Sequence, residues 1–284
     1  MDWRRLLPNI ALLGSFTLGT IAPALALPPP NTDRLGKFSL IYEPSDNKLH
    51  RALQDGLRKS GLFAKLIDDL NQSNLVLRTD IPVIIRDCGT ANAFYNPRDN
   101  SVTICNELFL QIAGDLENVT SENLQDSLTD ALYVSIFAFY HELGHALIDV
   151  LSLPTVGNEE DAADQFAALI LINSGDQEIA QKTIVNAATW FATSPEVPAW
   201  EQHVPNDKRF YNLVCMVYGS DPREYQSLGR KIPKERADLC PQEFAKINNS
   251  WNQLLLPHFL EANRPWSGRA ERRSTRNPPA GRIW

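Results

Sequence analysis

Residues 139–171, FYHELGHALIDVLSLPTVGNEEDAADQFAALIL, place ionisable side chains inside an apolar run. His141 and His145 are four residues apart, so a helix puts both imidazoles on one face, where they can bind one zinc ion. Glu142 is rotated away from that face but stays close to a water molecule on the metal, where a general base is needed. The segment HELGH therefore predicts a zinc site on a buried helix.

Two other interpretations of this helix are weaker. Core histidines that bond to backbone carbonyls are one, but two buried histidines and a glutamate cost free energy when they lack partners. A membrane span over residues 128–151 is the other, and ionisable residues at 141, 142 and 145 would be costly there. Gly144 costs about 1 kcal/mol relative to alanine in a helix, so we expect backbone or substrate to approach it closely.

A catalytic zinc ion needs a third protein ligand and one open position. The metzincin arrangement is excluded, because Ile148 and Leu151 stand where it requires glycine and histidine. The expected helix 159–174 offers carboxylates instead, at Glu159, Glu160, Asp161 and Asp164. Glu160 and Asp164 share a helical face, so one can bind the metal while the other hydrogen-bonds a ligating histidine. The apolar run AALILI that follows favours a buried helix over a surface one.

The surrounding sequence predicts an α+β fold. Strands are expected over 37–43 and 75–88, where Pro82 indicates an edge or a bulge, and 92–105 has the alternation and turn of a β-hairpin. The expected helices are 45–71, divided at Gly61, 106–112, 128–151, 159–174, 176–193, 206–218 and 241–261. We therefore expect a small antiparallel or mixed sheet beside the buried HELGH helix, followed by a mostly helical C-terminal part.

Composition narrows the class of protein. The 284 residues are 43% hydrophobic and 21% charged, as in an ordinary globular protein. A net charge of −7 argues against a nucleic-acid partner. Residues 263–284 are rich in arginine and have the composition of a basic disordered tail.

The N-terminus has the pattern of an export signal. The basic segment MDWRR precedes an apolar run, and the small residues Ala24 and Ala26 precede an expected cut. An uncleaved membrane anchor is the alternative, but the run is short and broken by Pro8, Gly14 and Gly19. We expect a signal peptide at 1–26, a linker at 27–35 and one catalytic domain at 36–262, in a protein that is periplasmic or secreted, with no stable membrane span after signal cleavage.

Four cysteines, Cys88, Cys105, Cys215 and Cys240, follow the signal. An even count in an exported chain predicts two disulfides. Three pairings are open, and we favour the local pairs Cys88–Cys105 and Cys215–Cys240, since the hairpin would bring the first two to the same end.

HELGH followed by EDAAD, an E-x-x-A-D motif, resembles the gluzincin metallopeptidases. Among these the chain is most similar to a family of exported metallopeptidases classified as a domain of unknown function. The segments AFYNPRDNSVTICNEL and EQHVPNDKRFYNLVCMVYGSDP also resemble that family. The resemblance covers most of residues 36–260, and it implies a zincin-like fold in which His141, His145 and Glu160 bind Zn²⁺.

The same resemblance implies roles for other residues. Asp164 would orient a histidine and Glu142 would be the general base for a zinc-activated water. The segment HVPNDKR is similar to an H-P-x-x-x-x-R stretch of membrane-bound gluzincins, so His203 would stabilise the oxyanion, although valine replaces their proline. The strand 101–105 would be a sheet edge that aligns an extended substrate. The third ligand stays open among Glu159, Glu160 and Asp161.

The sequence thus predicts an exported zinc peptidase whose partner is a peptide or protein substrate. A non-catalytic, zinc-stabilised binding protein of the cell envelope is the alternative, and an intact Glu142 argues against it, because a structural zinc site needs no base. Substrate specificity and oligomeric state cannot be predicted from these patterns.

Overall fold

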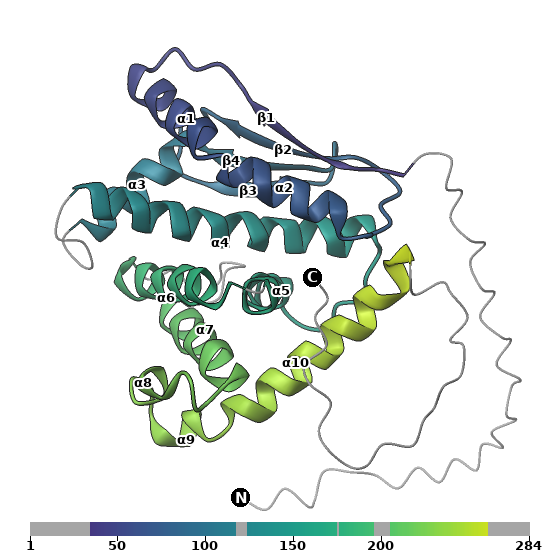
Figure 1. Cartoon of the computed structure of the whole chain (residues 1–284), viewed down its shortest axis with the longest axis vertical. Helices are drawn as coiled ribbons and strands as arrows, with labels where there is room; N and C mark the ends of the chain where they lie inside the picture. The colour runs from purple at the N-terminus through teal and green to yellow at the C-terminus, as the bar shows by residue number, and fades with distance from the viewer. Residues whose placement is uncertain (1–34, 118–123, 175, 196–204, 261–284) are drawn as a thin grey trace, which may run out of the picture. The chain divides into compact units, whose positions relative to one another are not determined.

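The computed structural model describes residues 35–117, 124–174, 176–195 and 205–260. The predicted signal peptide, nearly all of the linker, His203 and the predicted basic tail lie outside these described residues. Within them the chain is α+β, with one sheet and a larger helical part, as the sequence predicted (Figure 1).

Four strands form one mixed sheet in the order β1-β2-β4-β3. The strands are β1 (Phe38–Tyr42), β2 (Ile81–Arg86), β3 (Ala93–Asn96) and β4 (Ser101–Cys105). β2 runs parallel to both β1 and β4, and β3 pairs antiparallel with β4. β3 and β4 form the predicted hairpin, and Asn100 in its turn has a positive φ of 57°, which asparagine tolerates better than most residues.

Two predictions about the sheet edges are wrong. The strand 101–105 is β4, which is interior because it pairs with β2 as well as with β3, and all five of its residues are buried. The edge beside it is β3, which is partly exposed. Pro82 is likewise on an interior strand. The sheet tolerates it because pairing of β2 with β4 begins one residue later, at Val83, so no residue of β4 pairs with the proline.

The helices before the HELGH segment cover the sheet. α1 (Lys48–Ser60) and α2 (Leu62–Gln72) meet at Gly61, whose φ of 66° is left-handed and therefore favours glycine. α3 (Asn106–Leu116) starts directly after β4 and extends past the predicted end at residue 112.

The HELGH segment lies on α4 (Leu124–Val150), a helix of 27 residues between the sheet and the helices α5 and α6 (Figure 1). Its inner side chains are fully buried, among them Phe137, Phe139 and Leu143. By length and composition α4 could cross a membrane, but most of its apolar window is buried inside the protein. The apolar character of α4 is thus explained by its position in the core.

The C-terminal part is helical, as predicted. Its long helices are α5 (Glu159–Asn173), α6 (Gln177–Thr193), α7 (Asn206–Ser220) and α10 (Cys240–Leu255). The short helices α8 (Gln226–Gly229) and α9 (Lys234–Ala237) were not predicted, because a single turn has no measurable periodicity. The predicted helix 241–261 is divided into α10 and the 3-10 turn η2 (Leu256–His258).

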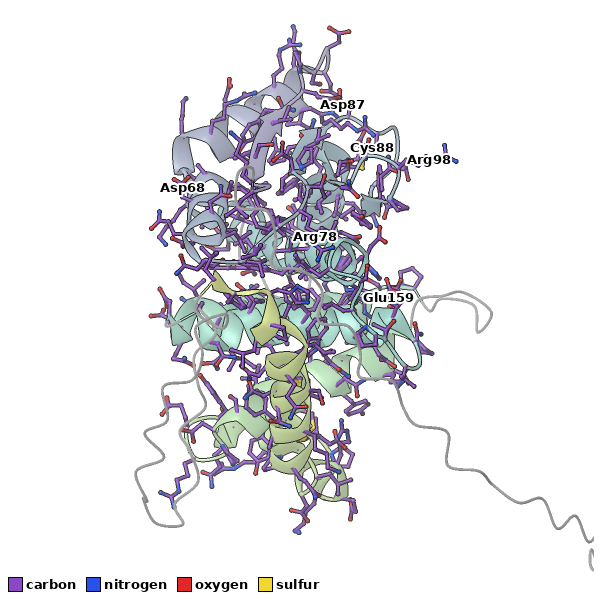
Figure 2. All side chains as sticks on the ribbon, turned by 90° about the vertical axis from the view of Figure 1, so that its right-hand side faces the viewer. Asp68, Arg78, Asp87, Cys88, Arg98 and Glu159 are labelled. Atoms are coloured by element: carbon purple, nitrogen blue, oxygen red, sulfur yellow. A yellow bond between two sulfur atoms is a disulfide. The ribbon has the colours of Figure 1, made fainter. Side chains whose placement is uncertain are left out.

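Both disulfides join the pairs that the sequence favoured. Cys88 bonds to Cys105 and Cys215 bonds to Cys240, with Cα–Cα distances of 5.5 and 5.1 Å. Cys88 follows Asp87 in the loop after β2 (Figure 2), so the first bridge ties this loop to the end of β4. The second ties α7 to the start of α10.

Gly144 sets the distance between α4 and α5. A Cβ atom at this position would lie 3.1 Å from the Cα of Ala163 and 3.2 Å from the ring of Phe166. The close approach expected at this glycine is therefore made by the backbone of the next helix. It brings the first turns of α5 against the histidines of α4.

We expect Gly144→Ala to destabilise the fold relative to the matched change Gly56→Ala. Gly56 is on an exposed part of α1, where an added methyl group would meet no other atom within 4 Å, so alanine there should stabilise by about 0.5–1 kcal/mol. At Gly144 the same methyl group meets α5, and overpacking should offset that gain by about 1–3 kcal/mol. Urea unfolding of both variants measures the difference, and equal stabilisation by both would contradict the close contact.

Candidate metal centre

Two imidazoles of α4 face each other. The Nε2 atoms of His141 and His145 are 3.2 Å apart, and the two rings are nearly perpendicular. His141 is buried, and the side chain of His145 is 14% exposed, so one edge of the pair reaches solvent. This is the arrangement expected of two residues one helical turn apart on the same face.

Glu160 reaches the same point from α5. Asn158 caps this helix by accepting a hydrogen bond from the Glu160 backbone N–H at 3.0 Å, which fixes the first turn. One oxygen of the Glu160 carboxylate lies 3.2 Å from Nε2 of His141, and the other oxygen lies 3.5 Å from Nε2 of His145. In a tetrahedral zinc site with ligands at 2.0–2.1 Å, donor atoms are about 3.3 Å apart. The three donors therefore fit a single zinc ion.

The other ring nitrogens bind carboxylates. Nδ1 of His141 is 2.8 Å from Asp164, and Nδ1 of His145 is 2.7 Å from Glu159, the residue labelled at the start of α5 in Figure 2. A carboxylate on Nδ1 fixes the orientation of the ring and leaves Nε2 available to a metal. Glu159 thus contacts the side of His145 away from the donor cluster.

The side chain of Asp161 points toward α7 and away from the two Nε2 atoms. Its carboxylate pairs with Lys208 at 3.1 Å, on the face of α5 that meets α7. Of the three acids that the sequence left open as third ligand, only Glu160 lies beside both Nε2 atoms. The i, i+4 relation of Glu160 and Asp164 places Glu160 beside the two Nε2 atoms and Asp164 behind His141.

Arg209 supports the site from α7. Its Nε and Nη2 donate to the two oxygens of Asp164 at 2.8 and 2.6 Å, and its guanidinium stacks over the ring of Phe191 at 3.6 Å. Arg209 is the last residue of the segment HVPNDKR, which the sequence pattern related only to His203. The bond of Arg209 to Asp164 was therefore missed. Since 45 residues separate the two partners, no local spacing could have predicted the pair.

The electrostatics of the site favour protonated histidines and ionised carboxylates. Burial would lower the pKa of His141, but hydrogen bonds to Asp164 and Glu160 outweigh it and raise that pKa to about 9. Burial would raise the pKa of Asp164, but Arg209 and His141 lower it to about 2. The two histidines likewise hold the pKa of Glu160 below its usual range, against the effect of burial. Both carboxylates are therefore ionised at neutral pH and favour a positive charge beside them, which a proton on the histidines or a metal cation at the Nε2 atoms would supply.

Glu142 lies beside the donor cluster and not within it. Its Oε2 accepts a hydrogen bond of 2.9 Å from the backbone N–H of Tyr95 on the edge strand β3. The hydroxyl of Tyr95 is held in turn by Asp149, at 2.7 Å. The carboxylate of Glu142 thus lies between the histidine pair and the edge of the sheet.

Two cavities meet at His141 and Glu142. The larger, of about 700 Å³, is polar and also borders His145, Glu159 and Glu160. The smaller, of about 290 Å³, extends along α4 between α3 and α6 and is mainly apolar. A ligand that spans both cavities would pass directly over the carboxylate of Glu142.

Residues 42–255 match the family model described as "Putative metallopeptidase". A search of curated proteins and a search of solved structures each gave no significant match. The matched range contains both HELGH and EDAAD and most of the described fold. It spans well over half of the chain, and the chain therefore belongs to this metallopeptidase family.

Proposed function

We propose that this protein is an exported, zinc-dependent peptidase in which His141, His145 and Glu160 bind the metal and Glu142 is the general base. The proposal is supported by the convergence of two Nε2 atoms, 3.2 Å apart, on the carboxylate of Glu160, whose two oxygens lie 3.2 Å from His141 and 3.5 Å from His145. Two imidazoles and one carboxylate are a ligand set that suits zinc and leaves one coordination position for chemistry.

His141, His145 and Glu160 would hold a zinc ion, which would supply Lewis acidity toward a peptide carbonyl and toward a water molecule, whose pKa it would lower to about 7. Glu142 accepts the proton of the attacking water and donates it to the leaving amine. Its bond to the N–H of Tyr95 keeps the carboxylate at the opening where the two cavities meet. Asp164 and Glu159 hold the rings of His141 and His145 in the orientation that exposes Nε2.

Arg209 acts through Asp164. A buried carboxylate needs compensation, and the paired bonds from the guanidinium supply it. The role of His203 as an oxyanion stabiliser stays a prediction, since that residue lies outside the described ranges.

Two features support export. The basic and apolar pattern at the N-terminus is that of a secretory signal, and two disulfides are compatible with an oxidising compartment. Metal and disulfides would then both stabilise the same domain outside the cytoplasm.

The ligand set predicts how metal content responds to substitution. Protein lacking residues 1–26 should hold about one zinc per chain, and both His145→Ala and Glu160→Gln should lose it. Glu159→Gln should keep the metal with about 10- to 100-fold lower affinity, because it only orients His145. Asp161→Asn, on the same turn but paired with Lys208, is the control and should match the wild type. Elemental analysis and competition with a chelator measure these values.

Retention of zinc by Glu160→Gln together with its loss from Glu159→Gln would reassign the third ligand. No zinc in the wild-type protein after reconstitution would contradict a metal site altogether. Either outcome is read from metal content and needs no knowledge of the substrate.

General-base catalysis is tested by Glu142→Gln in the zinc-loaded protein. We expect peptide cleavage to fall by about 10²–10⁴-fold with metal content unchanged, because the amide cannot accept the proton. Glu178→Gln, an exposed change of the same chemistry on α6, is the matched control and should be fully active. A diverse peptide mixture analysed by mass spectrometry measures cleavage. Equal cleavage by both variants would exclude Glu142 as the base, and absence of cleavage by the zinc-loaded wild type would favour the binding-protein alternative.

A further inference from the structure

The apolar cavity beside Glu142 is built by the same helical face that carries the candidate metal centre. Val134, Phe137 and Ala138 precede His141 and Glu142 at the spacing i, i+3, i+4, i+7, i+8, so all five project toward one side of α4. The cavity is therefore continuous with the reaction centre, because its floor and the general base belong to one rigid element.

The remaining walls are also largely apolar. Leu108 comes from α3, and Trp190 and Phe191 come from the last turn of α6. Phe191 packs edge-on against Phe137 with ring centroids 6.1 Å apart, which fixes one wall against the floor. The cavity volume is about 290 Å³. Since an apolar cavity of about 150 Å³ binds benzene, this one has room for a large aromatic or aliphatic side chain.

Three of the polar side chains that line the cavity form bonds to other protein groups. The amide of Asn206 donates to the backbone oxygen of Pro195 at 2.7 Å, and the indole N–H of Trp190 donates to Asp115 at 3.0 Å. The guanidinium of Arg209 forms a paired contact with Asp164. A charged substrate side chain that rests on the apolar floor and walls would lose hydration there, which costs free energy that an apolar side chain does not lose.

We propose that this cavity is the specificity subsite of the peptidase and that it selects a large apolar residue directly beside the scissile bond. This inference rests on the proposed function. The polar cavity on the other side of Glu142, bordered by Glu159 and Glu160, receives the chain on the opposite side of that bond. Substrates are accordingly extended peptides with a phenylalanine-, leucine- or methionine-like residue at one of the two positions that flank the cut.

Cleavage of a defined peptide series by the zinc-loaded protein tests the inference. The peptides share one sequence and differ only at the two flanking positions, which carry phenylalanine, leucine, glycine, aspartate or lysine in turn. We expect kcat/KM to be about 10- to 100-fold higher for phenylalanine or leucine than for glycine at one flanking position, and lowest for the charged residues there. The position at which the preference appears identifies the side of the bond that enters the cavity.

Ala138 allows the cavity to be filled without altering the metal ligands. It is partly exposed, one turn before Glu142, so Ala138→Phe places a ring in the space that a substrate side chain would use. Relative to cleavage at glycine, cleavage at phenylalanine should fall by about 10-fold or more, which removes most of the preference. Ala64→Phe, on an exposed position of α2, is the matched control and should keep the wild-type profile. Metal content and thermal unfolding of both variants identify a folding defect, in which case Ala138→Leu replaces the larger change.

The outcomes distinguish failure of the proposed subsite from failure of the proposed peptidase function. Cleavage by the wild type with no apolar preference, or with the same preference in Ala138→Phe, overturns the subsite and leaves the peptidase intact. Absence of cleavage of every peptide by zinc-loaded protein overturns the proposed function and the subsite together. An apolar preference that Ala138→Phe weakens by about 10-fold or more and Ala64→Phe keeps supports both.

Discussion

The close packing of α5 on α4 is the constraint on which the candidate site depends. Gly144 lacks a side chain at the crossing, and the backbone of Ala163 occupies that space. Glu160 lies three residues before Ala163, so the same contact carries its carboxylate to the histidines of α4. Because its oxygens lie at 3.2 and 3.5 Å from the two Nε2 atoms, a separation wider by even one methyl group would take the acid out of the donor cluster.

Helices that supply no ligand are nevertheless part of the site. Asp164 is buried and would be costly there alone, but it receives Arg209 from α7 and the imidazole of His141 from α4. The guanidinium in turn stacks on Phe191 of α6. One chain of charge-assisted bonds and ring contacts thus connects four helices, and the orientation of a candidate ligand depends on the packing of the C-terminal part.

The sheet contributes through its edge. β3 is the strand next to α4, and its Tyr95 N–H holds the carboxylate of Glu142 where the polar and apolar cavities meet. An exposed strand edge offers backbone groups to an extended peptide. Glu142, the edge strand and two chemically different cavities therefore converge within one small region, which is the combination that the proposed peptide hydrolysis would require.

Local patterns in the sequence predicted the α+β class and the long helices and contained the acid and histidine motifs, because each of these depends on residues near one another in the chain. They favoured the local disulfide pairs but left three pairings open. The HELGH and EDAAD spacings also restricted the third ligand to a few acids. Only the tertiary structure placed β4 inside the sheet and β3 at its edge, since a hairpin pattern does not say which of its strands will pair with a third. The Arg209–Asp164 pair and the apolar cavity also depend on the tertiary structure. Both bring together side chains from different helices, and the relative positions of those helices follow from core packing, which no local sequence pattern predicts.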